Sequence, residues 1–157
     1  MSMATQIEET RDADIAMRKR ARRFVLWNAA VFACSLPFDA YTTAWEGESS
    51  TGAFGLLLIG WLGVPMGYFE WFANPLLLIA WICLWIRKPR HAIPLAVAAC
   101  AIAVAFAFRD KILVNEAGYI GRIVSLDAGY WLWVASAAGT LGTAIALTFG
   151  KGQRPAH

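Results

Sequence analysis

The sequence predicts an all-α integral membrane protein with four transmembrane helices and one extra short helix before the second of them. Two observations lead to this fold class. Of the 157 residues, 59% are hydrophobic and 16% are charged, which is more apolar surface than a soluble domain of this size can bury. The apolar residues also form long stretches, of the 18 or so residues that span a bilayer, and these lack the polar face of soluble bundle helices.

Four stretches have this character, and each would reach about 27–30 Å as a helix, close to the thickness of a hydrocarbon core. They are residues 24–41, 68–86, 91–108 and 130–149. We expect residues 1–23 to form a polar and basic cytoplasmic segment before this membrane domain of residues 24–149. Residues 150–157 are expected to form a short cytoplasmic tail.

The distribution of charge predicts the orientation of these spans. With four crossings, eleven of the fourteen Lys and Arg residues lie on the side of both termini, whereas seven of the eleven acidic residues lie on the other. Basic loops are retained in the cytoplasm, so both termini are expected there. This topology explains the basic residues without a nucleic-acid partner. The cluster "RKRARR" at 18–23 is expected to attract anionic lipid headgroups.

The apolar segment from residue 52 to residue 86 holds one charged residue, Glu70, and is far too long for a single span. Two crossings here would move "RKPR" to the outside and weaken the charge asymmetry. Three glycines and a proline in "GWLGVPMG" at 60–67 do not favour a continuous helix. We therefore expect a short helix at 53–62, either in the outer leaflet or re-entrant, and a true span that starts near Tyr68.

Glu70, Asn74 and Pro75 are the candidate polar site of this chain. Glu70 lies in the first turn of the second span, where a carboxylate gains from the helix dipole and still reaches water. Asn74 lies one turn deeper on the same face and needs a partner, for which a backbone carbonyl is expected. Pro75 removes a backbone donor and predicts a kink. The alternative is a broken helix with Asn74 as its N-cap, of the kind that lines substrate sites in transporters.

The third and fourth spans carry rows of small residues that recur every four positions. In lipid, small residues at this spacing let two helices approach closely. The expected packing positions are Ala99, Ala103, Ala107, Ala135, Gly139 and Gly142. The hydroxyl groups of Ser136, Thr140 and Thr143 are expected to bond within their own helix or across to a neighbour.

Two sequence motifs resemble those of a loose set of small bacterial four-helix inner-membrane proteins. They are "WFANPLLL" at 71–78, which follows "GW" at 60–61, and "GYWLWVAS" at 129–136. In layout, the resemblance covers most of the chain. It implies a multi-pass protein of the bacterial inner membrane, and it implies no activity and no functional residue.

Two classes of function fit this sequence. It contains no catalytic constellation, metal-ligand spacing or phosphate loop, so we expect a non-enzymatic protein without cofactor or metal. The leading hypothesis is an assembly, accessory or immunity-type component that associates with itself or with another membrane protein. The alternative is a small transporter or channel that uses a broken helix around Glu70, Asn74 and Pro75. Transporters usually keep ionisable groups near the bilayer midplane, whereas every charge here is expected at a boundary or in a loop.

Overall fold

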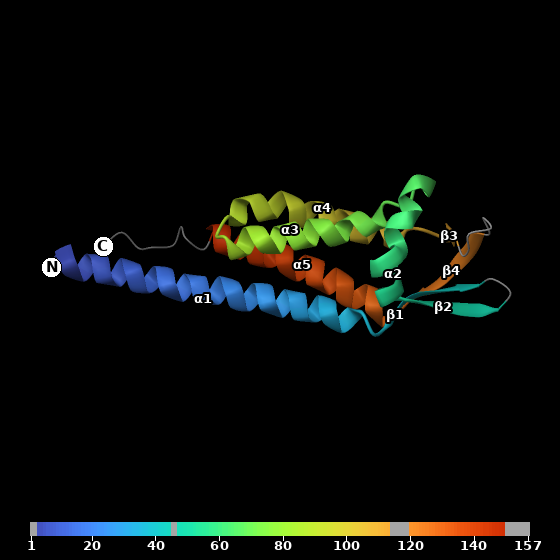
Figure 1. The fold of residues 1–157 in the computed structure, drawn as a ribbon, viewed down its shortest axis with the longest axis horizontal. Coiled ribbons are helices and arrows are strands. Elements are labelled where there is room, and N and C mark those ends of the chain that lie inside the picture. The colour runs from blue at the N-terminus through green and yellow to red at the C-terminus, as the bar shows by residue number, and fades with distance from the viewer. Residues whose placement is uncertain (1–2, 45–46, 114–119, 150–157) are drawn as a thin grey trace.

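The structure, a computed structural model, describes residues 3–44, 47–113 and 120–149. It is mostly helical (75%) and contains a small sheet. Helices run along the long axis of the molecule, and the strands gather at one end of it (Figure 1). The expected all-α class is therefore corrected: helices dominate, but a four-stranded sheet covers one end of the bundle. The predicted tail at 150–157 lies outside the described residues.

Four helices form the bundle. They are α1 (Met3–Ser35), α3 (Ala73–Trp85), α4 (Pro89–Ala107) and α5 (Ala128–Phe149). α5 packs against both α1 and α4, and α3 packs against α4. α4 and α5 each begin and end within two residues of a predicted span. Pro89 occupies the first position of α4, where its missing N–H leaves no intrahelical bond unmade.

The other two bundle helices differ from the predicted spans. α1 ends at Ser35 because Leu36 precedes Pro37, and the residue before a proline disfavours helical angles. α3 has 13 residues and is preceded by a 3-10 turn, η2 (Glu70–Phe72). Among the described residues, two helices, α4 and α5, are long and apolar enough to cross a membrane, where four were expected. Core helices of soluble proteins can have the same length and composition, so these two properties by themselves do not establish a membrane span.

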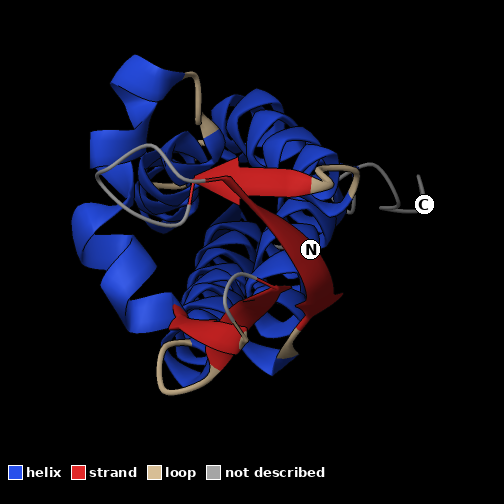
Figure 2. Cartoon of the chain, turned by 90° about the vertical axis from the view of Figure 1, so that its right-hand side faces the viewer, coloured by secondary structure: helices blue, strands red, loops and turns tan. Residues whose placement is uncertain are grey.

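The sheet is antiparallel throughout, in the order β2-β1-β4-β3. Its strands are β1 (Asp39–Ala44), β2 (Glu48–Gly52), β3 (Lys111–Leu113) and β4 (Ile120–Leu126). At the centre of the sheet, Tyr41 lies opposite Leu126 and Ala44 lies opposite Arg122. A view along the bundle shows the strands lying across the ends of the helices (Figure 2). The sheet is therefore a cap on the bundle, which we call the cap.

The expected short helix before the second span is present. α2 (Ala53–Ile59) leads directly into the 3-10 helix η1 (Gly60–Met66), and both lie beside the cap. Gly67 caps the end of η1, and its φ of 86° is a conformation that glycine adopts without strain. Within these two fully described helices no residue is buried. Their position relative to a membrane stays a prediction.

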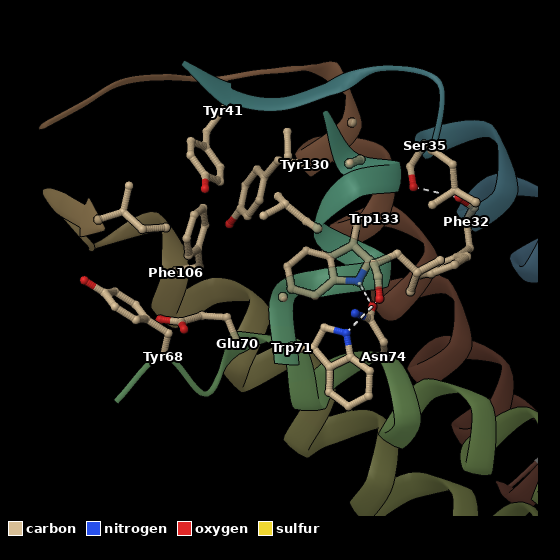
Figure 3. Close-up of a pocket in the computed structure, with 18 residues that line it drawn as sticks. Phe32, Ser35, Tyr41, Tyr68, Glu70, Trp71, Asn74, Phe106, Tyr130 and Trp133 are labelled. Atoms are coloured by element: carbon tan, nitrogen blue, oxygen red, sulfur yellow. Dashed lines mark hydrogen bonds between the residues drawn. The ribbon is translucent and has the colours of Figure 1, made fainter. Parts of the chain in front are cut away.

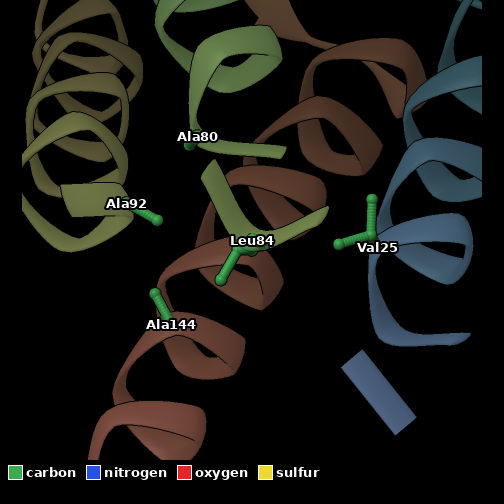
Figure 4. Close-up of a cluster of buried hydrophobic side chains, with 5 residues drawn as sticks. All are labelled: Val25, Ala80, Leu84, Ala92 and Ala144. Carbon is green, nitrogen blue, oxygen red and sulfur yellow. The ribbon is translucent and has the colours of Figure 1, made fainter. Parts of the chain in front are cut away.

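The interior of the bundle is built mainly from small side chains. At the end far from the cap, a buried cluster joins all four helices through Val25, Ala80, Leu84, Ala92 and Ala144 (Figure 4). A second cluster lies nearer the middle and contains Ala73, Leu77, Ala99 and Ala137. The third is at the junction of bundle and cap, and there the buried side chains are Ala40, Tyr41, Phe106 and Tyr130. Large buried aromatic rings are therefore found only at this junction, among the described residues.

Candidate functional site

A cavity of about 140 Å³ lies where the cap and α2 meet the bundle. Its wall is mostly apolar and rich in aromatic rings, which come from helices and strands far apart in the sequence (Figure 3). These are Phe32, Tyr41, Tyr68, Trp71, Phe106, Tyr130 and Trp133. Glu70 and Asn74, the two polar residues of the predicted site, line the same cavity. An apolar cavity with a few polar groups is the usual form of a small-molecule site.

Three aromatic rings and an indole form one continuous wall of the cavity. The ring centres of Tyr41 and Phe106 are 5.5 Å apart, those of Phe106 and Tyr130 are 5.7 Å apart, and those of Tyr130 and Trp133 are 6.1 Å apart. These separations are in the range preferred by aromatic pairs. The Tyr130 hydroxyl donates to the Ala103 carbonyl at 2.9 Å, so the wall is fixed to α4.

The start of α5 is held closely against the cap. A Cβ atom on Gly129 would lie 2.7 Å from the carbonyl oxygen of Asp39, so only glycine allows this approach. The Asp127 carboxylate accepts hydrogen bonds from Thr42 Oγ1 at 2.8 Å and from Ser125 Oγ at 2.9 Å. These contacts tie α5, and with it the aromatic wall, to strands β1 and β4.

Glu70 is paired with a cation. It forms an ion pair with Arg109, which follows α4, and the Arg109 guanidinium lies 4.9 Å from the centre of the Tyr68 ring. The side chains of Glu70 and Arg109 are 19% and 34% exposed, so the pair is shielded from water only in part. The negative charge of Glu70 at the edge of the cavity is therefore balanced by Arg109 of the same chain.

Asn74 is oriented by the indole of Trp133. An indole N–H can only donate, so the amide atom that faces it is the oxygen: Trp133 Nε1 donates to Asn74 Oδ1 at 3.0 Å. The sequence predicted a backbone carbonyl as the partner of this side chain, whereas the structure shows the Trp133 indole as the partner of its oxygen. The Nδ2 group of Asn74 then turns toward the centre of the cavity (Figure 3). A second indole, that of Trp71, donates to the Leu57 carbonyl at 2.9 Å and ties η2 to α2.

Tyr41, on strand β1, is an ionisable residue of the wall with a raised pKa. Burial raises its pKa above the ordinary 10.0, and the nearby Tyr68 and Glu70 raise it further, against a hydrogen bond with Thr51 that lowers it. The hydroxyl therefore stays protonated at neutral pH.

Pro75 lies in the first turn of α3. The helix starts at Ala73, so Asn74 and Pro75 are its second and third residues, and Phe72 precedes it with helical angles of φ −63° and ψ −18°. N–H groups in a first turn have no intrahelical acceptor, so a proline at this position does not force a kink. Asn74 is likewise not the N-cap that the broken-helix alternative requires. The change from the 3-10 turn to the α-helix falls between Phe72 and Ala73, so Pro75 already lies within the α-helix.

The expected packing row on α4 and α5 is present only in part. Ala99 and Ala103 are fully buried on α4. Three other positions are exposed: Ala107, Ala135 and Gly142. A Cβ atom on Gly142 would meet nothing within 4 Å. On α5 the buried positions are instead Gly129, Tyr130, Ser136, Ala137, Thr140, Thr143 and Ala144.

Gly139 packs against α1 and not against α4. A Cβ atom on Gly139 would collide with Oδ1 of Asn28, which is 4% exposed. Asn28 Nδ2 donates to Thr143 Oγ1 at 3.2 Å and to the Phe24 carbonyl at 2.9 Å, and Ser136 Oγ donates to the Asn28 carbonyl at 2.9 Å. Asn28 was not among the predicted site or packing residues, although a lone amide inside an apolar stretch is the signal that identifies it.

The described residues provide no group of three or more His, Cys, Asp or Glu side chains that could hold a metal ion. No protein-family model, curated protein or solved structure matches the chain. The geometry of the cavity and the surface of the bundle are therefore the basis for a function.

Proposed function

We propose that this chain is a multi-pass membrane protein whose four bundle helices cross the bacterial inner membrane. The observation that carries this proposal is the low burial of the apolar helices. Only 28% of the most apolar 18-residue stretch of α4 is buried, and the same share of the corresponding stretch of α5. A core helix of a soluble protein is mostly buried. Large apolar side chains are exposed on all four helices, among them Leu26, Trp27, Leu78, Ile82, Val97, Val104, Trp131 and Ile145.

The composition of the bundle interior supports the same proposal. Its fully or almost fully buried positions are mainly alanine: Ala73, Ala80, Ala92, Ala96, Ala99, Ala103, Ala137 and Ala144. Polar side chains such as Asn28, Ser136 and Thr140 are buried beside them. In lipid, large apolar side chains gain little by leaving the acyl chains, so helices associate through small residues and hydrogen bonds. A large apolar exterior around a small interior is the arrangement expected there.

Two of the proposed spans are short, and basic side chains at their ends can extend to the membrane–water interface. The apolar part of α1, residues 24–35, is about 18 Å long, and the helical segment of residues 70–85 is about 24 Å long. The guanidinium of Arg22 lies 4.9 Å from the ring centre of Trp85, at the end far from the cap. Long basic side chains reach from a short helix to the headgroups, and bilayers thin locally around such helices.

The orientation follows from the two basic clusters. The Arg22–Trp85 contact brings the cluster at 18–23 to the end of α3, beside the cluster at 87–90, and both are opposite the cap. Basic loops remain in the cytoplasm. We therefore place the start of α1 and the end of α5 at the cytoplasmic face, with the cap outside and anionic lipid headgroups at the basic clusters.

We further propose a non-enzymatic role as an assembly, accessory or immunity-type component that associates with itself or with a larger membrane protein. The cap and the exposed apolar segment α2–η1 offer surfaces for such contacts, including Phe54, Leu58, Trp61 and Met66. The pairing of Glu70 with Arg109, at the outer end of the bundle, disfavours a transporter that uses this carboxylate. A proton or ion flux in vesicles that Glu70→Gln abolishes would reverse that choice.

Cysteine labelling tests the topology. In a background where Cys34, Cys83 and Cys100 are replaced, a cysteine at the exposed Ser49 of β2 should react with an impermeant maleimide in intact cells. A cysteine at the exposed His91 should react only after the cells are opened. Labelling of both positions in intact cells, or release of the protein by alkaline carbonate, would refute the proposed topology.

The assembly role has its own measurement. The mass of the purified protein in mild detergent, corrected for bound detergent, should exceed that of the 17.2 kDa chain, through self-association or a stoichiometric membrane partner. A lone monomer across a range of mild detergents would contradict this role, although it would leave the topology untouched.

A further inference from the structure

We propose that the cavity between cap and bundle holds the upper part of an acyl chain from a bilayer phospholipid, with the ester carbonyl bound to Asn74. This inference rests on the proposed membrane location and deepens it. It assigns a ligand class to a cavity that a purely structural bundle would not need.

The depth of the cavity fits the ester region of a lipid. On α2, Leu56 and Leu57 line the cavity, whereas Phe54, Leu58 and Ile59 of the same helix are exposed. On this side, a single apolar helix therefore separates the cavity from the surroundings. In the proposed orientation α2 lies where the outer ends of the spans meet the polar cap, the level at which ester groups separate hydrocarbon from headgroups.

The size and lining of the cavity fit a short hydrocarbon segment. Its volume is about 140 Å³, and an apolar cavity of about 150 Å³ accepts a benzene-sized group of roughly six carbon atoms. The aromatic wall from Tyr41 to Trp133 offers flat apolar contact to methylene groups, and the cavity is not enclosed, so a longer chain can continue out of it. The first methylenes of an acyl chain fill such a space.

The charges around the cavity favour a ligand without a cationic group there. An aromatic site binds a quaternary ammonium through its ring faces, and a free carboxylate nearby strengthens that binding. Here the Glu70 carboxylate is already paired with Arg109, whose guanidinium also lies over the Tyr68 ring. A cationic headgroup would have to displace this arginine, whereas a neutral acyl chain would not.

One polar group is placed to recognise an ester. The bond from Trp133 Nε1 to Asn74 Oδ1 fixes the amide plane and turns the Nδ2 donor toward the cavity (Figure 3). An ester carbonyl is an acceptor without a donor of its own, so it is complementary to this group. The ether oxygen of a dialkyl lipid is a poorer partner.

The experiment counts lipids retained by the detergent-purified protein in native mass spectrometry. Leu57→Trp fills the cavity from α2 and keeps the backbone carbonyl that Trp71 uses. Leu58→Trp adds the same side chain to the exposed face of the same helix and is the matched control. We expect the wild type and Leu58→Trp to retain one diacyl phosphatidylglycerol, and Leu57→Trp to bind it at least tenfold more weakly. Equal retention by the two variants would overturn the site.

A second comparison tests recognition of the ester and does not depend on Leu57→Trp folding well. The wild type should bind diacyl phosphatidylglycerol about fivefold more tightly than the dialkyl analogue, the factor that one neutral hydrogen bond supplies. Asn74→Leu should bind the two lipids equally. No preference in the wild type would refute the ester contact. A preference for phosphatidylcholine that Glu70→Gln removes would replace the acyl site by a cation site.

Alkaline carbonate extraction separates failure of this inference from failure of the proposed function. If the wild type stays in the membrane fraction but retains no lipid in the cavity, the acyl site is wrong and the membrane location stands. If carbonate releases the wild type, both are wrong.

Discussion

Replacement of Gly139 by alanine tests the contact between α1 and α5. The added Cβ atom would collide with Oδ1 of Asn28, a buried side chain that two hydrogen bonds from its Nδ2 hold in place. Gly142 on the same helix is the matched control, because a Cβ atom there would meet open space. Both substitutions change helix propensity equally, so the difference between them isolates the collision.

The expected magnitude follows from three contributions. Alanine in place of glycine stabilises a helix interior by about 1 kcal/mol. Overpacking costs about 1–3 kcal/mol, and loss of the bond from Asn28 to Thr143 costs about 0.6 kcal/mol in lipid. Gly139→Ala should therefore destabilise the bundle by about 0.6–2.6 kcal/mol, whereas Gly142→Ala should stabilise it by up to about 1 kcal/mol.

The assay is unfolding of the purified protein in detergent, followed by circular dichroism. The double variant Asn28→Ala with Gly139→Ala removes the collision, so its destabilisation should be smaller than the sum of the two single effects, by about 1 kcal/mol or more. Equal stability of Gly139→Ala and Gly142→Ala would refute this account of the α1–α5 contact. Strict additivity of the double variant would refute the role of Asn28.

Three further predictions concern the cavity. Tyr41 has a raised pKa in the folded state, so its contribution to stability is present below pH 10 and is lost as the pH rises further. Tyr41→Phe should therefore flatten the fall in melting temperature above pH 10, and an unchanged pH profile would contradict this. Glu70→Gln and Arg109→Gln should each cost at most about 1 kcal/mol in thermal unfolding, and the double variant should cost less than their sum. Trp133→Phe should lower stability by about 1 kcal/mol, and far less in an Asn74→Leu background, because the indole then has no amide to donate to.

The sequence alone predicted the elements that depend on local patterns. α4 and α5 follow from uninterrupted apolar stretches, and their ends were predicted within two residues. The short helix at 53–59 was predicted because the apolar segment of residues 52–86 is too long for one bilayer crossing and is broken by glycines. Glu70 and Asn74 were recognisable as polar exceptions in an apolar segment, and both line the cavity. Each of these features lies within a few turns of chain.

Tertiary structure alone decided the cap and the partners of the polar residues. β1 pairs with β4 across about eighty residues of chain, and Tyr41 and Thr42 had been assigned to the end of a span and the loop after it. Asn74 meets Trp133 59 positions away, and Asn28 meets Thr143 115 positions away. The periodicity of apolar residues shows which side of a helix is apolar, but it does not show which neighbouring helix that side contacts. Gly139 and Gly142 look equivalent in the sequence, and only the close approach of Asn28 on α1 makes a larger residue costly at Gly139.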